Sequence, residues 1–132
     1  MLENLSRYQP QVLALLRIMA ALLFIEHGTM KLFGFPSSGD AGGGGSLGTL
    51  MLVAGILETF GGLLILIGLF TRPAAFLLSG MMAVAYFMAH APNSFFPVLN
   101  QGDAAILFCF VFLYLVVAGP GAWSVDGARK SA

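Results

Sequence analysis

Four long apolar stretches dominate this sequence and leave few folds open to it. They cover residues 12–33, 47–70, 73–91 and 103–119. An apolar run of about 18 or more residues has the length of a helix that crosses a lipid bilayer. Hydrophobic residues make up 58% of the chain and charged residues only 9%, whereas about a quarter of the residues are charged in a typical soluble domain. The sequence therefore predicts an integral membrane protein with four spans.

The spans are expected to be helices. Lipid cannot hydrogen-bond the backbone, and a helix satisfies its N–H and C=O groups within one segment. The period-two alternation of a membrane β-barrel is absent from the sequence. We therefore predict an all-α four-helix bundle, with residues 1–132 forming a single domain. The first apolar run is too long for a cleavable signal peptide, so we expect it to remain as the first span.

The composition argues against several functions. The formal net charge is zero, which provides no basic surface for nucleic acid. Cys109 is the only cysteine, so neither an internal disulfide nor a CxxC redox pair can form. Its apolar neighbours indicate a small packing residue. The glycine-rich segment 37–46 lacks the Gly-Lys-Ser/Thr of a phosphate-binding loop and is interpreted as a linker.

The second span carries a face of small residues. Gly48, Gly55 and Gly62 recur every seven residues, and Glu58 shares their side of a helix. Small residues let helices approach closely in membranes. We therefore expect this face to pack against other helices, with Glu58 turned toward them.

The distribution of basic residues predicts the topology. With four spans, both termini lie on the same side as a tight turn expected at residues 71–73, where proline opens the third span. Lys31 is the one basic residue near a span end on the opposite side. The positive-inside rule therefore predicts cytoplasmic termini, N-in and C-in. Trp123 follows the end of the fourth span, where an interfacial anchor is expected. The basic residues on the side of the termini are Arg7, Arg72, Arg129 and Lys130.

Ionisable residues inside the spans indicate a polar site. Such residues are costly in lipid and usually face the bundle interior. Their depth in the bilayer can be estimated from a helical rise of about 1.5 Å per residue. By this estimate most of the ionisable residues lie in the outer leaflet, near a loop that carries Phe95 and Phe96. We predict a ligand or proton site there, and a contact between Arg17 and Glu58 at mid-depth, either direct or through water. The outer residues are Glu26, His27, Lys31, His90 and Asp103.

Several of these residues also have a structural interpretation. The Arg17–Glu58 contact can be architectural rather than catalytic. Lys31 can extend its ammonium group to the membrane surface, and Asp103 can serve only to cap a helix N-terminus. The two histidines are harder to explain by packing, because imidazole can relay protons or bind metal.

Three segments of the chain resemble the DoxX family of small bacterial membrane proteins. They contain a first-span arginine with His-Gly-x-x-Lys, a second span with glutamate and paired glycines, and a Gly-Pro-Gly-x-Trp-Ser-x-Asp ending. The resemblance covers almost the whole chain. The segments are LRIMAALLFIEHGTMKLFGF (16–35), GILETFGGLLILIGLFTRPAA (55–75) and GPGAWSVD (119–126).

The resemblance implies a four-helix protein of a bacterial or archaeal plasma membrane. Some relatives are named as subunits of thiosulfate:quinone oxidoreductase. Others are linked to oxidative-stress defence alongside superoxide dismutase and sulfurtransferase, or are induced with quinone and catechol detoxification. Family membership alone does not establish an enzymatic activity.

The first functional hypothesis is a quinone-linked redox protein of the membrane. A quinone needs an apolar slot with a few groups that hydrogen-bond or exchange protons at its carbonyls. No flavin or nicotinamide motif is present, so electrons would come from a soluble redox partner, a second membrane subunit or a bound cofactor. The predicted catalytic residues are His27, Glu58 and His90, and the predicted ligand-binding residues are Arg17, Glu26, Lys31, Phe95, Phe96 and Asp103.

Three alternatives remain open. The protein can be a non-catalytic anchor or assembly subunit for a redox partner. His27 and His90 can ligate a haem, although two histidines without a motif are weak support, and no other metal site is predicted. Small-molecule transport would require a larger bundle or a homo-oligomer, because four helices leave little lumen.

Overall fold

The structure is a computed structural model that describes residues 2–36 and 48–131. Helices and turns, and no strands, make up this part of the chain, which confirms the all-α class. Three helical runs are long and apolar enough to cross a membrane: Leu2–Phe33, Thr49–Ile67 and Thr71–Asn93. The fourth predicted span corresponds to α6 (Asp103–Ala118), which is apolar but shorter. The linker predicted at residues 37–46 lies outside the described residues.

The chain divides into two compact units. Unit 1 consists of Met1–Phe70 and Pro120–Ala132, and unit 2 consists of Thr71–Gly119. Unit 1 contains helices from both ends of the chain, whereas unit 2 is one continuous segment. The C-terminal segment therefore belongs with the first two spans rather than with the helix that precedes it.

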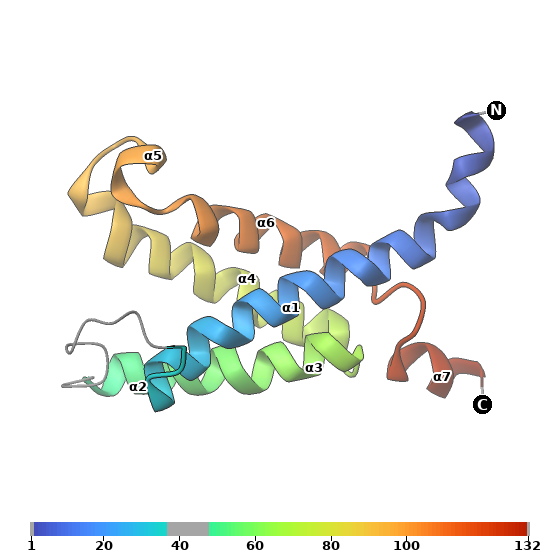
Figure 1. The fold of residues 1–132 in the computed structure, drawn as a ribbon, viewed down its shortest axis with the longest axis horizontal. Helices are drawn as coiled ribbons and strands as arrows, with labels where there is room; N and C mark the ends of the chain where they lie inside the picture. The colour runs from blue at the N-terminus through green and yellow to red at the C-terminus, as the bar shows by residue number, and fades with distance from the viewer. Residues whose placement is uncertain (1, 37–47, 132) are drawn as a thin grey trace. The chain divides into compact units, whose positions relative to one another are not determined.

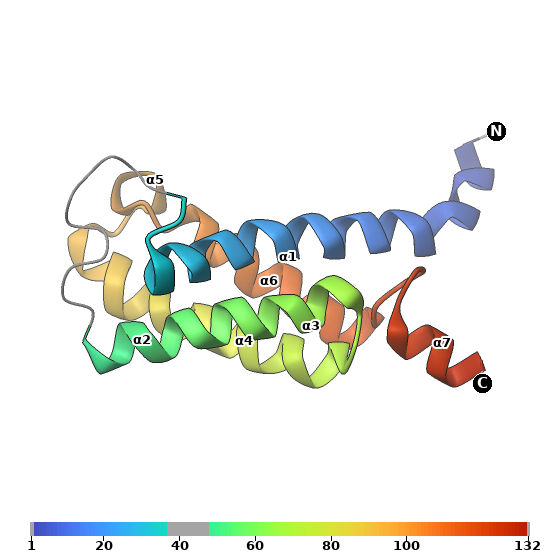
Figure 2. The same cartoon turned by 60° about the horizontal axis from the view of Figure 1, so that its bottom comes forward.

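Unit 1 is built around two antiparallel helical runs (Figure 1, Figure 2). The first joins the 3₁₀ helix η1 (Leu2–Tyr8) to α1 (Gln9–Phe33). The second joins α2 (Thr49–Ile56), the π-helix η2 (Leu57–Gly61) and α3 (Gly62–Ile67).

Glycines allow the two runs to approach closely. A Cβ atom added to Gly62 would lie 2.6 Å from Cγ1 of Ile25, and one added to Gly55 would lie 3.0 Å from Leu32. The predicted small-residue face is therefore confirmed for Gly55 and Gly62. Gly48 has nothing within 4 Å of such an atom and lies outside this contact.

Left-handed residues end the helices of unit 1. Gly34 terminates α1 with φ 68°, and its N–H donates to the carbonyl of Met30. Gly68 terminates α3 with φ 70°, a conformation that glycine adopts without steric cost. The turn predicted at residues 71–73 is wrong, because Thr71 already begins α4 and the chain turns at residues 68–70. Proline is tolerated in the first helical turn, where its missing N–H would have no helical partner.

Unit 2 is a hairpin of two long helical runs (Figure 1). The first joins α4 (Thr71–Ala85), the π-helix η3 (Tyr86–His90) and the 3₁₀ helix η4 (Ala91–Asn93). A short helix, α5 (Pro97–Asn100), then leads into α6.

Two side chains tie α4 to α6 within unit 2. The Ser79 hydroxyl donates to the carbonyl of Cys109 at 2.8 Å. Arg72 donates to the carbonyls of Val116 and Val117 at 2.8 and 2.7 Å. Because the last carbonyls of a helix have no helical partner, Arg72 caps the C-terminus of α6.

Exposed apolar side chains run along the helices, as expected for a protein in lipid. Along α1, Leu15, Met19 and Leu22 are each about half exposed. A continuous exposed apolar surface is typical of a face that contacts a membrane or another protein. The buried positions of α1 are mostly small, and Arg17 is the charged exception: Ala14, Arg17, Ala20, Ala21, Phe24 and Gly28.

Candidate functional site

An ion pair between Lys31 and Glu58 joins the two helical runs of unit 1. The Lys31 ammonium donates to both carboxylate oxygens, at 2.8 and 3.1 Å. The Glu58 side chain is 5% exposed and that of Lys31 is 22% exposed. A buried carboxylate is stable in an apolar span only when it is paired and hydrogen-bonded. The ammonium also lies 3.4 Å from the carbonyl of His27.

The helical run changes from α to π geometry at Glu58. Glu58 lies in η2, a single π-helical segment within an otherwise α-helical run. Such π segments occur frequently at functional sites. Neighbouring Thr59 is 8% exposed, and its hydroxyl has no hydrogen-bond partner among the described residues. The site therefore combines an ion pair, an unusual backbone and a buried hydroxyl.

Gly28 allows α1 to lie against this π segment. A Cβ atom on Gly28 would come within 2.7 Å of the Thr59 backbone nitrogen and 2.9 Å of Glu58 Cβ. Backbone contacts this short leave no room for a side chain. The glycine of the His-Gly-x-x-Lys motif therefore permits the close approach, and the lysine one turn later provides the counter-charge.

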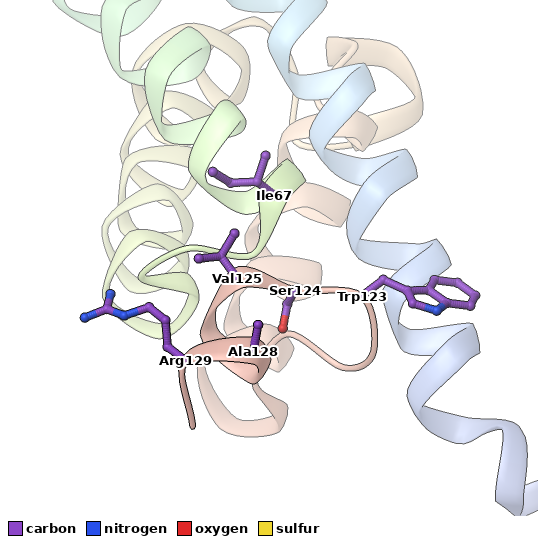
Figure 3. A pocket seen from close by; sticks show the side chains of 6 residues that line it. All are labelled: Ile67, Trp123, Ser124, Val125, Ala128 and Arg129. Atoms are coloured by element: carbon purple, nitrogen blue, oxygen red, sulfur yellow. The ribbon is translucent and has the colours of Figure 1, made fainter. Parts of the chain in front are cut away.

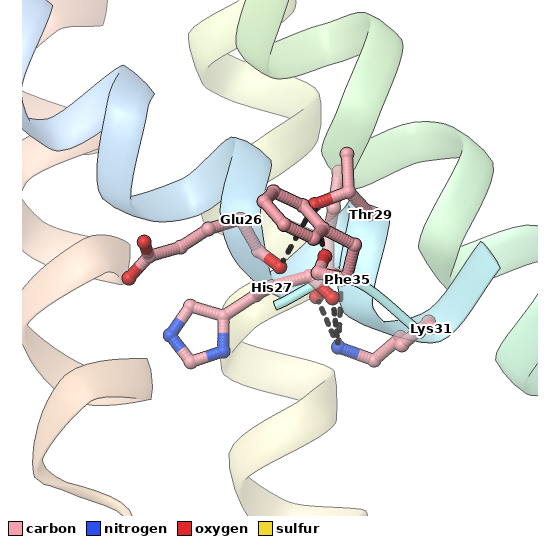
Figure 4. A network of polar contacts seen from close by, with 6 residues as sticks. Glu26, His27, Thr29, Lys31 and Phe35 are labelled. Atoms are coloured by element: carbon pink, nitrogen blue, oxygen red, sulfur yellow. Dashed lines mark hydrogen bonds and ion pairs between the residues drawn. The ribbon is translucent and has the colours of Figure 1, made fainter. Parts of the chain in front are cut away.

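The other polar residues of this part of α1 point elsewhere. Figure 4 shows the Glu26 carboxylate turned away from the Lys31 ammonium group. Both Glu26 and His27 are exposed. The Thr29 hydroxyl donates to the carbonyl of Phe35 at 2.7 Å, which ties the residues after α1 back to the helix.

The predicted contact between Arg17 and Glu58 is wrong. Arg17 is fully buried, and its guanidinium donates to the carbonyls of the C-terminal segment and of Leu66 at the end of α3. The antiparallel register explains the difference, because it places Glu58 opposite Lys31 and the end of α3 opposite Arg17. Lys31, for which extension to the membrane surface remained open, is the partner of Glu58. The C-terminal acceptors of Arg17 are Pro120, Ala122 and Trp123.

The Gly-Pro-Gly-x-Trp-Ser-x-Asp ending supplies these acceptors by folding back onto unit 1. The N–H of Ala122 donates to the carbonyl of Pro10 at 3.0 Å. The N–H of Asp126 donates to the carbonyl of Gly68 at 2.9 Å, and its carboxylate accepts from the N–H of Phe70. A Cβ atom on Gly121, which has φ 75°, would lie 2.7 Å from the carbonyl oxygen of Pro10. The motif is therefore a docking segment for α1 and α3.

Unit 2 has its own polar cluster, around His90. His90 ends the π-helix η3, and its Nδ1 lies 3.0 Å from the carbonyl oxygen of Asn100. Asn100 is 3% exposed and donates to the Tyr86 hydroxyl and the carbonyl of Ser94. Its side-chain oxygen accepts the N–H of Gly102 at 2.8 Å. Asn100 thus organises the loop before α6.

Sequence reasoning missed Asn100. The available signal was an amide side chain between Pro97 and Gly102, a position where asparagine commonly bonds to nearby backbone. The remaining predicted residues of unit 2 are exposed. Asp103 is the first residue of α6, where a negative charge favours the helix dipole. Phe95 and Phe96 are 86% and 58% exposed, with their rings edge to face.

These features define a helical integral membrane protein with polar groups inside its spans. The DoxX family profile matches residues 12–91, which is more than half of the chain. The chain belongs to the DoxX family. The match includes Arg17, the Lys31–Glu58 pair and His90.

Two curated proteins are similar over most of their length. An uncharacterized protein of Haemophilus influenzae is 47% identical over 128 residues, which cover 95% of this chain and 96% of that protein. The inner membrane protein YqjF of Escherichia coli is 31% identical over 117 residues, covering 83% of this chain and 85% of YqjF. No solved structure matches the chain.

Proposed function

We propose that this DoxX protein binds a lipid-soluble quinone at the Lys31–Glu58 pair and acts as a quinone-linked redox component of the bacterial plasma membrane. The observation that carries the proposal is the ion pair itself. Glu58 is buried in an apolar span, within a π-helical segment, and is neutralised by a lysine of another helix. Intramembrane ionisable residues of this kind commonly mark ligand or proton pathways.

The chemistry of the pair suits a quinone headgroup. The Lys31 ammonium can donate a hydrogen bond to a quinone carbonyl oxygen, and the Glu58 carboxylate can accept or return a proton there. Quinone reduction consumes electrons as well as protons. Electrons would come from a soluble redox partner or a second membrane subunit.

Within unit 1, His27 remains a proposed member of this ligand site, and Glu26 remains a weaker proposed member. In unit 2, His90, Asp103, Phe95 and Phe96 remain proposed ligand-binding residues. Arg17 is left out, because the hydrogen bonds of its guanidinium go to backbone carbonyls. The histidines would relay protons, and the phenylalanines would form apolar walls.

A binding measurement tests the proposal. The purified protein in detergent is titrated calorimetrically with a decyl-chain ubiquinone analogue. We expect Lys31→Met and Glu58→Gln to weaken binding by about tenfold or more, since each removes a hydrogen bond to a charged group of about 1.5–3 kcal/mol. Glu3→Gln, which removes a charge from η1, is the matched control. Unchanged affinity in both variants would contradict a quinone site at this pair.

The second candidate is a non-catalytic anchor or assembly subunit. Glycine-mediated packing and the docked C-terminal segment favour it, because both features serve architecture. A wild-type protein that binds no quinone analogue, yet co-purifies with a stable redox partner, would support this function. A Soret band in the purified protein would instead support the haem-binding alternative.

We also propose four spans with both termini in the cytoplasm. The support is that η1 and α7 (Val125–Ser131) lie at the same end of unit 1 (Figure 1, Figure 2) and that both carry basic residues. Single-cysteine labelling in a Cys109→Ala background tests the topology. Ser6→Cys is expected to react only from the cytoplasm and Ser38→Cys only from outside. Labelling of Ser38→Cys from the cytoplasm alone would contradict it.

A further inference from the structure

A hollow of about 610 Å³ opens on the surface of unit 1, between the end of α3 and α7 (Figure 3). Its lining is mainly apolar, with an indole and a guanidinium among the lining groups. Figure 3 shows Trp123 and Arg129 on opposite sides of the hollow, with Val125 and Ala128 between them. The lining residues are Ile67, Trp123, Ser124, Val125, Ala128 and Arg129.

The hollow lies where a membrane span ends. Ile67 is the last residue of the apolar run Thr49–Ile67. An exposed tryptophan beside the end of a span is typical of the membrane–water interface, where headgroups meet acyl chains. The Trp123 side chain is 64% exposed. A ligand in this hollow would therefore contact both apolar side chains and the guanidinium of Arg129.

The backbone holds Trp123 in an unusual conformation. Its φ is 54°, in the left-handed region that bulky residues rarely adopt. Arg17 holds the residue there, because its guanidinium donates to the Trp123 carbonyl at 2.9 Å. A strained residue kept in place by a buried arginine, with its own side chain exposed, indicates a functional position. Trp123 is one of the residues that line the hollow, and its side chain is exposed there.

The charges around the hollow favour an anion. Arg129 lies 5.5 Å from the centre of the Phe70 ring, and its guanidinium makes no hydrogen bond or ion pair with any described residue. Lys130 follows it and is exposed. The one acid of α7, Asp126, is directed toward the backbone, where its carboxylate accepts the N–H of Phe70 at 2.9 Å. The outward charge of α7 is therefore positive.

We propose that this hollow binds the headgroup of an anionic phospholipid from the adjoining leaflet. Arg129 and Lys130 would bind the phosphate, and Ile67, Val125 and Ala128 would contact the glycerol and upper acyl chain. A guanidinium with open N–H groups matches phosphate oxygens in geometry and charge. The apolar lining and the end of the span identify the source of the phosphate as a lipid. The site is separate from Lys31 and Glu58 and does not depend on quinone binding.

Trp123 is the only tryptophan of the chain, so its fluorescence reports directly on the hollow. The full-length protein is reconstituted with dibrominated phosphatidylglycerol or with dibrominated phosphatidylcholine, which quench indole on contact. We expect stronger quenching by the anionic lipid. The preference should fall by up to about fivefold for each basic side chain removed, in Arg129→Gln and Lys130→Gln.

The control is Arg7→Gln, which removes an exposed basic residue of η1 outside the hollow and is expected to leave the lipid preference unchanged. Far-ultraviolet circular dichroism and melting temperature confirm that each variant is folded. Equal quenching of the wild type by the two lipids would overturn the proposal. A preference that is unchanged in both Arg129→Gln and Lys130→Gln, or that inorganic phosphate alone abolishes, would also overturn it.

Discussion

The two cations of α1, Lys31 and Arg17, are stabilised by different kinds of partner. Lys31 is neutralised by the carboxylate of Glu58, whereas Arg17 is surrounded by backbone carbonyls of the C-terminal segment and α3. They lie about 21 Å apart along the helix, so each has its own surroundings. A guanidinium can bond several acceptors at once, whereas an ammonium is a compact point charge.

The difference indicates that Arg17 supports the fold, whereas Lys31 and Glu58 form a local site that can take part in chemistry. The hydrogen bonds of Arg17 hold a segment that is distant in the sequence, and their acceptors are carbonyls that cannot change protonation. Lys31 and Glu58 both carry groups that can exchange protons, and Glu58 lies in a π-helical segment. Loss of Arg17 should therefore unfold the C-terminal segment, whereas loss of Lys31 or Glu58 should alter a local site.

The largest effect is expected for Arg17→Met. This change leaves several partly buried carbonyls without a donor and should lower the free energy of unfolding by about 3–4 kcal/mol. Titration with sodium dodecyl sulfate measures the loss, and limited proteolysis should cleave first within residues 120–131. Arg17→Lys is the control, since it retains the charge and should recover part of the stability. If Arg17→Met were as stable as the wild type, the proposed difference between the structural role of Arg17 and the local role of Lys31 would be contradicted.

The next largest effects on stability are expected in a double-mutant cycle at Lys31 and Glu58. Lys31→Met and Glu58→Leu should each cost about 2–3 kcal/mol, because each leaves one charge without its partner. The double variant should recover to within about 1 kcal/mol of the wild type.

The matched cycle combines Arg17→Met with Glu58→Leu. Those two losses should add, because the two side chains are not in contact. If the Arg17 cycle showed coupling and the Lys31 cycle did not, the pairing described above would be contradicted.

Gly28→Ala tests the close helix contact that supports the pair. The added methyl would meet the Thr59 backbone nitrogen, and such overpacking should cost about 2 kcal/mol. Gly80→Ala is the control, because nothing lies within 4 Å of a Cβ at that position in α4. It should leave stability unchanged or raise it by up to about 1 kcal/mol. Similar melting temperatures for the two variants would argue against a tight contact at Gly28.

The smallest effect is expected for Asp126→Asn. The amide oxygen can still accept the N–H of Phe70, so the variant should lose about 1 kcal/mol or less. Asp126→Ala removes the acceptor and should lose more. Melting temperatures in detergent distinguish the two. Equal losses in Asp126→Asn and Asp126→Ala would mean that the charge, which both variants remove, matters rather than the hydrogen bond.

Several features could be predicted from the sequence because they depend on local properties. Apolar length predicts membrane helices, and the predicted end of the first span at residue 33 agrees with the end of α1 at Phe33. The spacing of Gly55 and Gly62 around Glu58 correctly predicts a packed face, because helical periodicity alone determines which residues share a side.

The partners of the buried charges could not be predicted in the same way. Estimates of depth along single helices pair Arg17 with Glu58, because they place both residues near mid-membrane. The antiparallel register instead aligns Glu58 with Lys31, and only the folded C-terminal segment supplies the acceptors of Arg17. The π-helical segments and the role of Asn100 were also missed, since both arise from backbone geometry that residue types do not encode locally.

The sequence by itself determined the class of this protein: an all-helical membrane protein with charged groups placed inside its spans. Those properties follow from the cost of exposing apolar residues to water and backbone groups to lipid, and both costs can be read residue by residue. Only the tertiary structure decided which charge meets which partner. A pairing energy depends on distances between segments far apart in the chain, and close packing of small residues sets those distances.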